Sequence, residues 1–151
     1  MDPNLEARIR AGLAVGAEEP LTCDLISGLG ALAASSSGIR SLVGIQNLTS
    51  VTDLSLADNR FITNISTLSG LTSLTTLRLS FNSITDISAL SGLTGLTTIL
   101  LSDNPNLTDI QPLLDNSGLG AGVLVDLRST SVSCADVAAL QAKGVNVTSD
   151  C

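Results

Sequence analysis

The sequence predicts an α/β repeat solenoid: a stack of about five short parallel strands, backed by 3₁₀ or extended segments and closed by a helical cap at each end. Three observations predict this fold. A nine-residue pattern recurs along the 151-residue chain, its spacing is nearly constant, and the apolar residues are almost all aliphatic. Phe61 and Phe81 are the only aromatic residues. Thin layers of Leu, Ile and Val pack well in a regular stack without bulky rings.

The repeated pattern reads L-x-x-L-x-L-x-x-N and begins at Val51, Leu74 and Leu96, so its starts lie 23 and 22 residues apart. The alternating L-x-L segment predicts a short strand with one buried face. The ninth residue stands where the chain turns out of the strand, and an amide there can satisfy backbone groups of neighbouring turns. We therefore expect a ladder of asparagines. Its members are Asn59, Asn82 and Asn104.

The pattern weakens toward both ends, as the capping of a solenoid requires. Leu29–Ser37 fits it with Ser37 in the asparagine place, and Val125–Thr130 predicts a last strand. Between the strands Ile and Leu recur every third residue, a period that suits 3₁₀ or extended turns. We therefore expect one domain over residues 1–151. It comprises an N-terminal cap (1–28), repeats (29–132) and a C-terminal cap (133–151).

Local signals in the two caps predict helices. Asp2 is a good N-cap residue, and Pro3 suits the first helical position. Near the other end, the segment 133–144 predicts a helix that Gly144 stops, followed by a short extended segment at 145–147.

The run Thr85–Leu93 resembles the bacterial, internalin-like class of leucine-rich repeats, whose units carry I-T-D-I-S-x-L-x-x-L. The resemblance covers about Leu29–Val132, and Asp2–Arg10 is similar to the cap helix that precedes such repeats. It implies a right-handed superhelix with a concave strand face that serves as an interaction module. It also implies a secreted or surface-attached bacterial protein whose native signal peptide is not present in this chain. Internalin-type binders have longer arrays and aromatic-rich concave faces, so their role in recognising host proteins is not carried over.

Composition argues against several classes of function. The net charge is −7 and the basic residues are scattered, which disfavours nucleic acid and anionic membranes. No apolar stretch is long enough for membrane insertion. The chain has no histidine and no catalytic or phosphate-binding motif, so we expect neither an enzyme nor a cofactor. We interpret Asp58 and Asp103 as solvated acids rather than calcium ligands.

The three cysteines receive different predictions. Cys134 and Cys151 flank the C-terminal cap, and we expect a disulfide between them; the alternative is two reduced thiols. Such a bond would favour an oxidising compartment, hence an extracellular or cell-surface location. Cys23 lies in the other cap, too far away to join them. We expect it to be a small buried apolar residue, with an intermolecular or reactive thiol as the alternative.

A partner-binding patch is predicted on the strand face, where most outward-pointing positions are small. The larger ones cluster in the last three rows: Arg78, Phe81, Leu100, Asp103, Asp126 and Arg128. We expect Phe81 and Leu100 to form its apolar centre and a protein to be its partner, bound by a monomer. The alternative for these residues is ordinary packing, with Arg128 paired to Asp103 or Asp126. The alternative function is a structural spacer or surface scaffold domain within a larger secreted bacterial protein. Glycan binding is disfavoured because sugar sites usually need aromatic platforms.

Overall fold

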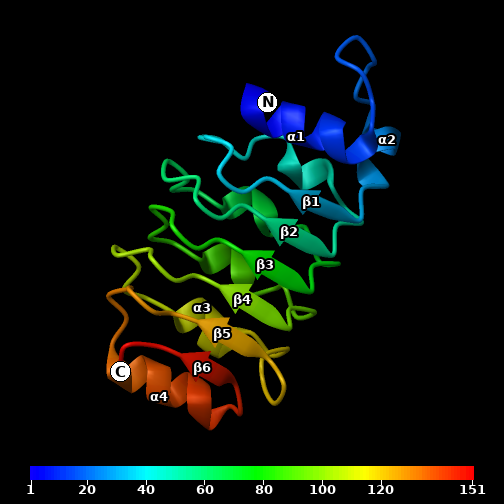
Figure 1. Ribbon diagram of the computed structural model, residues 1–151. Helices are drawn as coiled ribbons and strands as arrows, with labels where there is room; N and C mark the ends of the chain where they lie inside the picture. Colours follow the sequence, from blue (N-terminus) through cyan, green and yellow to red (C-terminus); the bar gives the residue numbers. More distant parts are fainter.

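Six short strands form one parallel sheet in the computed structural model, which describes residues 1–151. The strands follow one another in chain order, one per coil of the chain (Figure 1). They are β1 (Ala31–Ala33), β2 (Asp53–Ser55), β3 (Thr76–Arg78), β4 (Thr98–Leu100), β5 (Leu124–Asp126) and β6 (Asn146–Thr148). The parallel order and the single direction of travel confirm the predicted repeat solenoid.

The returning half of each coil carries a short helix behind the sheet (Figure 1). Three of these are 3₁₀ helices, as the three-residue period predicts: η1 (Ile45–Asn47), η2 (Ser66–Leu68) and η3 (Ser88–Leu90). The fourth coil instead has a short α-helix, α3 (Gln111–Asp115), with Pro112 in its first turn. Proline fits there because its missing N–H would have no helical acceptor.

β6 is a strand beyond the five that the pattern predicts. Val147 pairs with Val125 in register, and the Asn146 N–H donates to the Val123 carbonyl. The segment lacks the L-x-x-L-x-L-x-x-N signature, because the chain reaches it through the cap helix rather than through another full repeat. What the sequence indicates only as a short extended segment therefore continues the sheet.

The core is one continuous column of 38 buried aliphatic residues, and neither phenylalanine belongs to it. The middle residue of each strand points into this column. Leu54, Leu77, Ile99 and Val125 stand one above another through the strand register. Burial of such a column is the main favourable term for folding, and it needs no ring to fill a gap.

Helices close the two open ends of the stack (Figure 1). At the N-terminus α1 (Pro3–Leu13) packs on β1, and α2 (Cys23–Ser27) follows it. Asp2 caps α1 by accepting from the backbone N–H groups of Asn4 and Leu5. Its second carboxylate oxygen accepts from the N–H groups of Arg40 and Ser41, which ties the cap to the first coil.

At the other end α4 (Cys134–Ala142) lies against β6. A disulfide joins Cys134, the first residue of α4, to Cys151 beyond β6. The expectation that Cys23 is buried is wrong: it is exposed. Cys23 begins a five-residue helix that has room for one buried side chain, and Ile26 takes that place.

The longest helix, α1, has 11 residues, and no helix combines the length and apolarity of a membrane span.

Candidate functional site

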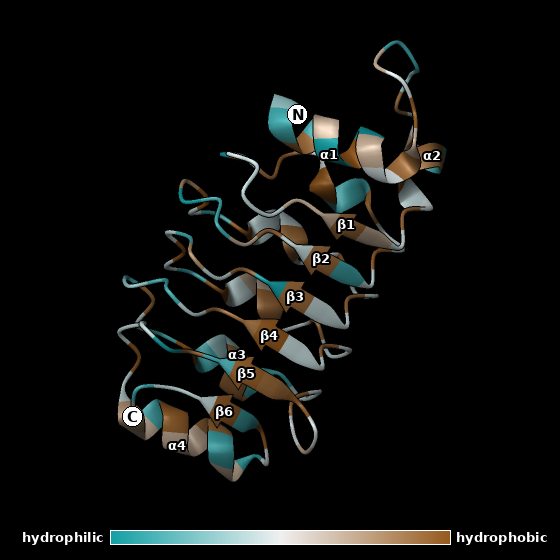
Figure 2. Cartoon of the chain, in the orientation of Figure 1, coloured by the Kyte–Doolittle hydropathy of each residue, from teal (hydrophilic) through white to brown (hydrophobic).

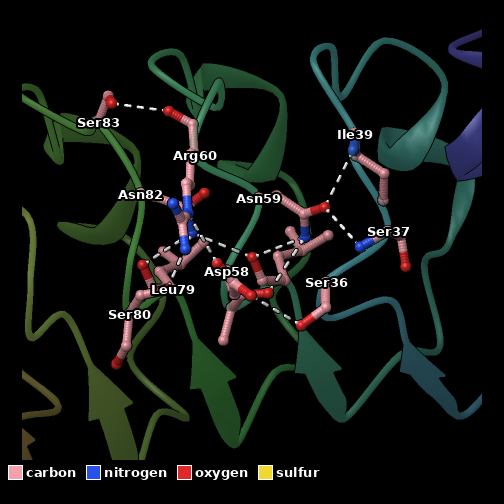
Figure 3. Close-up of polar contacts among 12 residues, drawn as sticks. Ser36, Ser37, Ile39, Asp58, Asn59, Arg60, Leu79, Ser80, Asn82 and Ser83 are labelled. Carbon is pink, nitrogen blue, oxygen red and sulfur yellow. Dashed lines mark hydrogen bonds and ion pairs between the residues drawn. The ribbon is translucent and has the colours of Figure 1, made fainter.

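The turns that contain Asn59, Asn82 and Asn104, which we call the asparagine turns, follow the carboxyl ends of β2, β3 and β4 and form one edge of the sheet. The side chain of Asn59 is fully buried, and its amide donates to the carbonyls of Ala34 and Leu56. Its carbonyl oxygen accepts from the N–H groups of Ser37 and Ile39, at 3.1 and 3.0 Å (Figure 3). Four backbone groups at a buried corner thus find partners in one side chain.

Asn82 makes the same donations to Leu56 and Leu79, but its Oδ1 accepts no hydrogen bond. The cause lies in the loop of the preceding coil, Asn59–Ile62. That loop is one residue longer than the loops Ser37–Ile39 and Asn82–Ile84. In those shorter loops the N–H of the final isoleucine donates to the Oδ1 of the asparagine in the next coil, Asn59 or Asn104. The Ile62 N–H instead donates to the carbonyl of Asn59. An extra residue here therefore leaves a buried acceptor without a partner.

The strand face places three of the predicted residues in one row. Arg78, Leu100 and Asp126 are register partners on β3, β4 and β5, so their side chains stand side by side on the outward face. The apolar neighbour of Leu100 on this face is Leu124, one diagonal step away on β5 and 38% exposed. In Figure 2 much of β4 and β5 is brown, whereas β2 and β3 end in teal or white residues.

Both arginines of the patch are held by carboxylates. Arg128 makes a two-point contact with Asp126, at 2.9 and 2.7 Å, which is one of the two pairings expected from sequence. The side-chain hydrogen bonds from Arg128 hold the pKa of Asp126 below its ordinary value, against the opposing effect of burial. Arg78 lies 2.6 Å from Asp53 on β2. The patch thus presents oriented ion pairs rather than free charges.

Phe81 and Asp103 lie elsewhere, in the turns beyond the strands. Both have left-handed backbones, with φ of 58° and 57°, and their coils pair through the hydrogen bond from the Phe81 N–H to the Ser102 carbonyl. Phe81 is 53% exposed, three residues past the end of β3. Phe81 therefore lies outside the strand, and the apolar residue beside Leu100 on the strand face is Leu124. Sequence reasoning missed Leu124, although its position in the strand pattern marks it as outward-pointing.

No group of three or more histidine, cysteine, aspartate or glutamate side chains comes together in a way that could hold a metal ion.

Comparison with known proteins places this geometry in a family of repeats. A family model described as leucine-rich repeats (2 copies) matches residues 72–115. An internalin from Listeria monocytogenes (inlF) has a similar structure, with a TM-score of 0.74 and 27% sequence identity. The match covers 99% of this chain and 51% of that internalin, so the chain spans about half its length. No curated protein matches the chain in sequence.

Two other internalins of the same organism match less well in structure. Internalin C2 gives a TM-score of 0.41 at 21% identity, covering 97% of this chain and 93% of its own. The domain of InlJ gives 0.47 at 19% identity, covering 97% and 42%. The repeat match over residues 72–115 and the structural similarity to inlF both support the internalin-like leucine-rich repeats that the motifs predict. Such a fold implies a protein–protein interaction module.

Proposed function

We propose that this chain binds a partner protein through its strand face, at a patch centred on Leu100 and Leu124. The carrying observation is that two neighbouring leucines stay partly exposed on a face whose other outward positions are mostly small or polar. Leucines at these outward positions do not belong to the buried core, which is formed by the inward-pointing residues. An apolar pair of this kind is the usual centre of a protein contact.

The ion pairs around the leucines support specificity. Asp126 holds Arg128 and Asp53 holds Arg78, so each guanidinium is already oriented before a partner arrives. Oriented arginines at the margin of an apolar centre suit hydrogen bonding to a partner's backbone or carboxylates. Phe81 and Asp103 extend the rim toward the asparagine turns. Six short strands give a small footprint, so we expect a weak or multivalent contact made by a monomer.

We further propose an extracellular or cell-surface location in a bacterium. The disulfide between Cys134 and Cys151 supports it, since such bonds persist in oxidising compartments. The structural similarity to an internalin supports it as well. A non-catalytic role fits the same comparisons.

Site-specific photo-crosslinking tests the strand-face proposal. A photoreactive residue at Leu124 should capture a protein from culture medium or cell-surface extract, and Leu100→Ser in the same chain should abolish the capture. A photoreactive residue at Thr72, exposed on the returning half of a coil, is the matched control. Equal capture at Leu124 and Thr72, or capture that Leu100→Ser leaves intact, would show that the face has no specific partner. That result would favour a spacer or scaffold domain.

A further inference from the structure

The two aromatic residues of the chain both lie on its surface, on neighbouring coils at the asparagine edge. Phe61 is 56% exposed and Phe81 is 53% exposed. With more than half of each side chain exposed, neither ring contributes the burial energy of an aromatic residue in a core. Their position outside a wholly aliphatic core calls for another explanation.

Phe61 stands in the lengthened loop between Asn59 and Ile62. The insertion costs the fold a buried hydrogen bond, because it leaves Asn82 Oδ1 without a donor. Neither Arg60 nor Phe61 repays that cost by packing, since both are exposed. Burial of its own side chains therefore does not explain the lengthened loop.

Arg40 holds the ring, and Arg60 lines a hollow beside it. The guanidinium of Arg40 lies over the Phe61 ring, 4.2 Å from its centroid, which fixes the aromatic face in place. Arg60 pairs with Asp58 yet remains 81% exposed. A hollow of about 290 Å³ opens beside them, lined by Ser36, Gly38, Asp58, Arg60 and Phe61.

The charge of this edge is opposite to that of the molecule. Three of the seven basic residues contact the turns of the first two coils, since Arg8 donates to Ser37, Arg40 covers Phe61 and Arg60 pairs with Asp58; two of the fourteen acidic residues contact the same turns. Those two are Asp2 and Asp58, and both carboxylates are already engaged, by backbone N–H groups and by Ser36 and Arg60 respectively. The edge is therefore net positive on a chain of net charge −7.

We propose that Arg40, Arg60 and Phe61 form a second docking site, which we call the aromatic edge, for a protein segment that carries carboxylates beside an apolar side chain. The apolar side chain enters the hollow against the Phe61 ring. The carboxylates pair with the guanidinium groups of Arg40 and Arg60, which are complementary in charge. This site is independent of the strand face, because Phe61 lies in a loop beyond the end of β2 while Leu100 and Leu124 lie on β4 and β5.

Selection from a phage-displayed library of short random peptides, panned on the whole disulfide-bonded protein, tests this proposal. Selected peptides should be enriched in aspartate or glutamate next to leucine or an aromatic residue. Titration with the synthetic peptides should show affinity about tenfold lower for Phe61→Ser and a comparable loss for the Arg40→Gln, Arg60→Gln double variant. Added salt should weaken the binding of the wild type.

Asn106→Ser is the matched control, because Asn106 occupies the equivalent place in the lengthened loop after Asn104 and is likewise exposed. It should bind the peptides as the wild type does. A peptide series with lysine in place of its acidic residues should not bind. Selected peptides without acidic enrichment, equal affinity for Phe61→Ser, or no selectable peptide at all would overturn the proposal. Peptides that lose affinity only with Leu100→Ser would instead support the strand face.

Discussion

Asn59 and Asn82 occupy equivalent turns but make unequal numbers of hydrogen bonds. The Oδ1 of Asn59 accepts two, and that of Asn82 accepts none. We expect Asn59→Ala to lower the free energy of unfolding by about 3 kcal/mol or more, since it leaves several buried backbone groups unpaired. The loss for Asn82→Ala should be smaller than that for Asn59→Ala by about 1–2 kcal/mol, because Asn82 loses only the hydrogen bonds that it donates.

Urea denaturation of the two variants measures this difference. The exposed Asn106→Ala is the control and should unfold as the wild type does. Equal losses for Asn59→Ala and Asn82→Ala would mean that the acceptor bonds of Asn59 contribute little net stability.

Phe81 is the unusual residue in a column of left-handed turns. The equivalent positions of the other coils hold small polar residues, which tolerate a positive φ better than an aromatic side chain does. They are Ser36, Asp58, Asp103 and Ser129. We expect Phe81→Asn to raise the free energy of unfolding by about 1 kcal/mol, since the exposed ring forfeits little burial. Thermal unfolding measures it, with Asp103→Asn as a near-neutral control. Destabilisation by Phe81→Asn would show instead that the ring packs usefully.

Among the elements, α1 is held on the first coil by core packing and by three side chains, of which Asp2 makes the most hydrogen bonds. Burial alone would raise the pKa of Asp2, but hydrogen bonds from the N–H groups of Arg40, Leu5, Asn4 and Ser41 outweigh it and lower the pKa. We expect Asp2→Ala to cost about 2 kcal/mol at neutral pH, through the lost cap and the lost link to the coil. Asp2→Asn should cost less, because one acceptor remains.

The pH dependence of that difference follows from the direction of the shift. The folded pKa lies below the ordinary value of 3.8, so the stabilisation is present above 3.8 and disappears as the pH falls through the folded pKa. Urea midpoints of wild type and Asp2→Ala should therefore differ most at neutral pH, and the difference should narrow under strong acid toward that between Asp2→Asn and Asp2→Ala. A constant difference down to that range would assign the effect to the alanine itself rather than to the carboxylate.

At this scale the sequence predicts most elements, but it indicates the last one only as a short extended segment and not as a paired strand. The L-x-L alternation identifies the strands of the repeats, and the Asp2–Pro3 pair identifies the start of α1. The pairing of β6 with β5 is not predicted, because the three residues of β6 carry no repeat signature and their position depends on the preceding helix α4. The α-helical form of α3 is not predicted either, since the three-residue period indicates 3₁₀ or extended turns. Lys143, which follows α4, donates to the carbonyls of Leu113, Leu114 and Asn116 at the end of α3. Contacts of that separation have no local pattern.

For the whole molecule, the stacking order is predictable and the surface is less so. Register follows from the repeat spacing, which brings Arg78, Leu100 and Asp126 into one row. The conformation of the turn after β3 does not follow from a letter pattern, so Phe81 is assigned to the strand face although it belongs to the rim. The surroundings of Phe61 are not predictable from sequence for the same reason. In the folded chain the Ile62 N–H donates to the Asn59 carbonyl instead of to Asn82, and Arg40 covers the Phe61 ring; neither contact has a sequence pattern.

Because each coil of a solenoid contacts only its neighbours, stability is distributed along the stack. The disulfide closes a 17-residue separation between α4 and the tail, and a loop of this size contributes about 3 kcal/mol. Its removal should act first on the last coil. There the Leu127 N–H donates to the Thr148 carbonyl, and the Ser129 N–H donates to Asp150.

We therefore expect Cys134→Ser, Cys151→Ser to increase amide hydrogen exchange at Leu127 and Ser129 strongly, while β2, β3 and β4 change little. Hydrogen exchange of the double variant, with Cys23→Ser as the control for loss of a thiol, measures this gradient. The central coils keep neighbours on both sides, so their opening still requires disruption of two interfaces. A uniform increase across all six strands would contradict the nearest-neighbour argument: the stack would then open as one cooperative unit, and the disulfide would stabilise it only by restricting the unfolded chain.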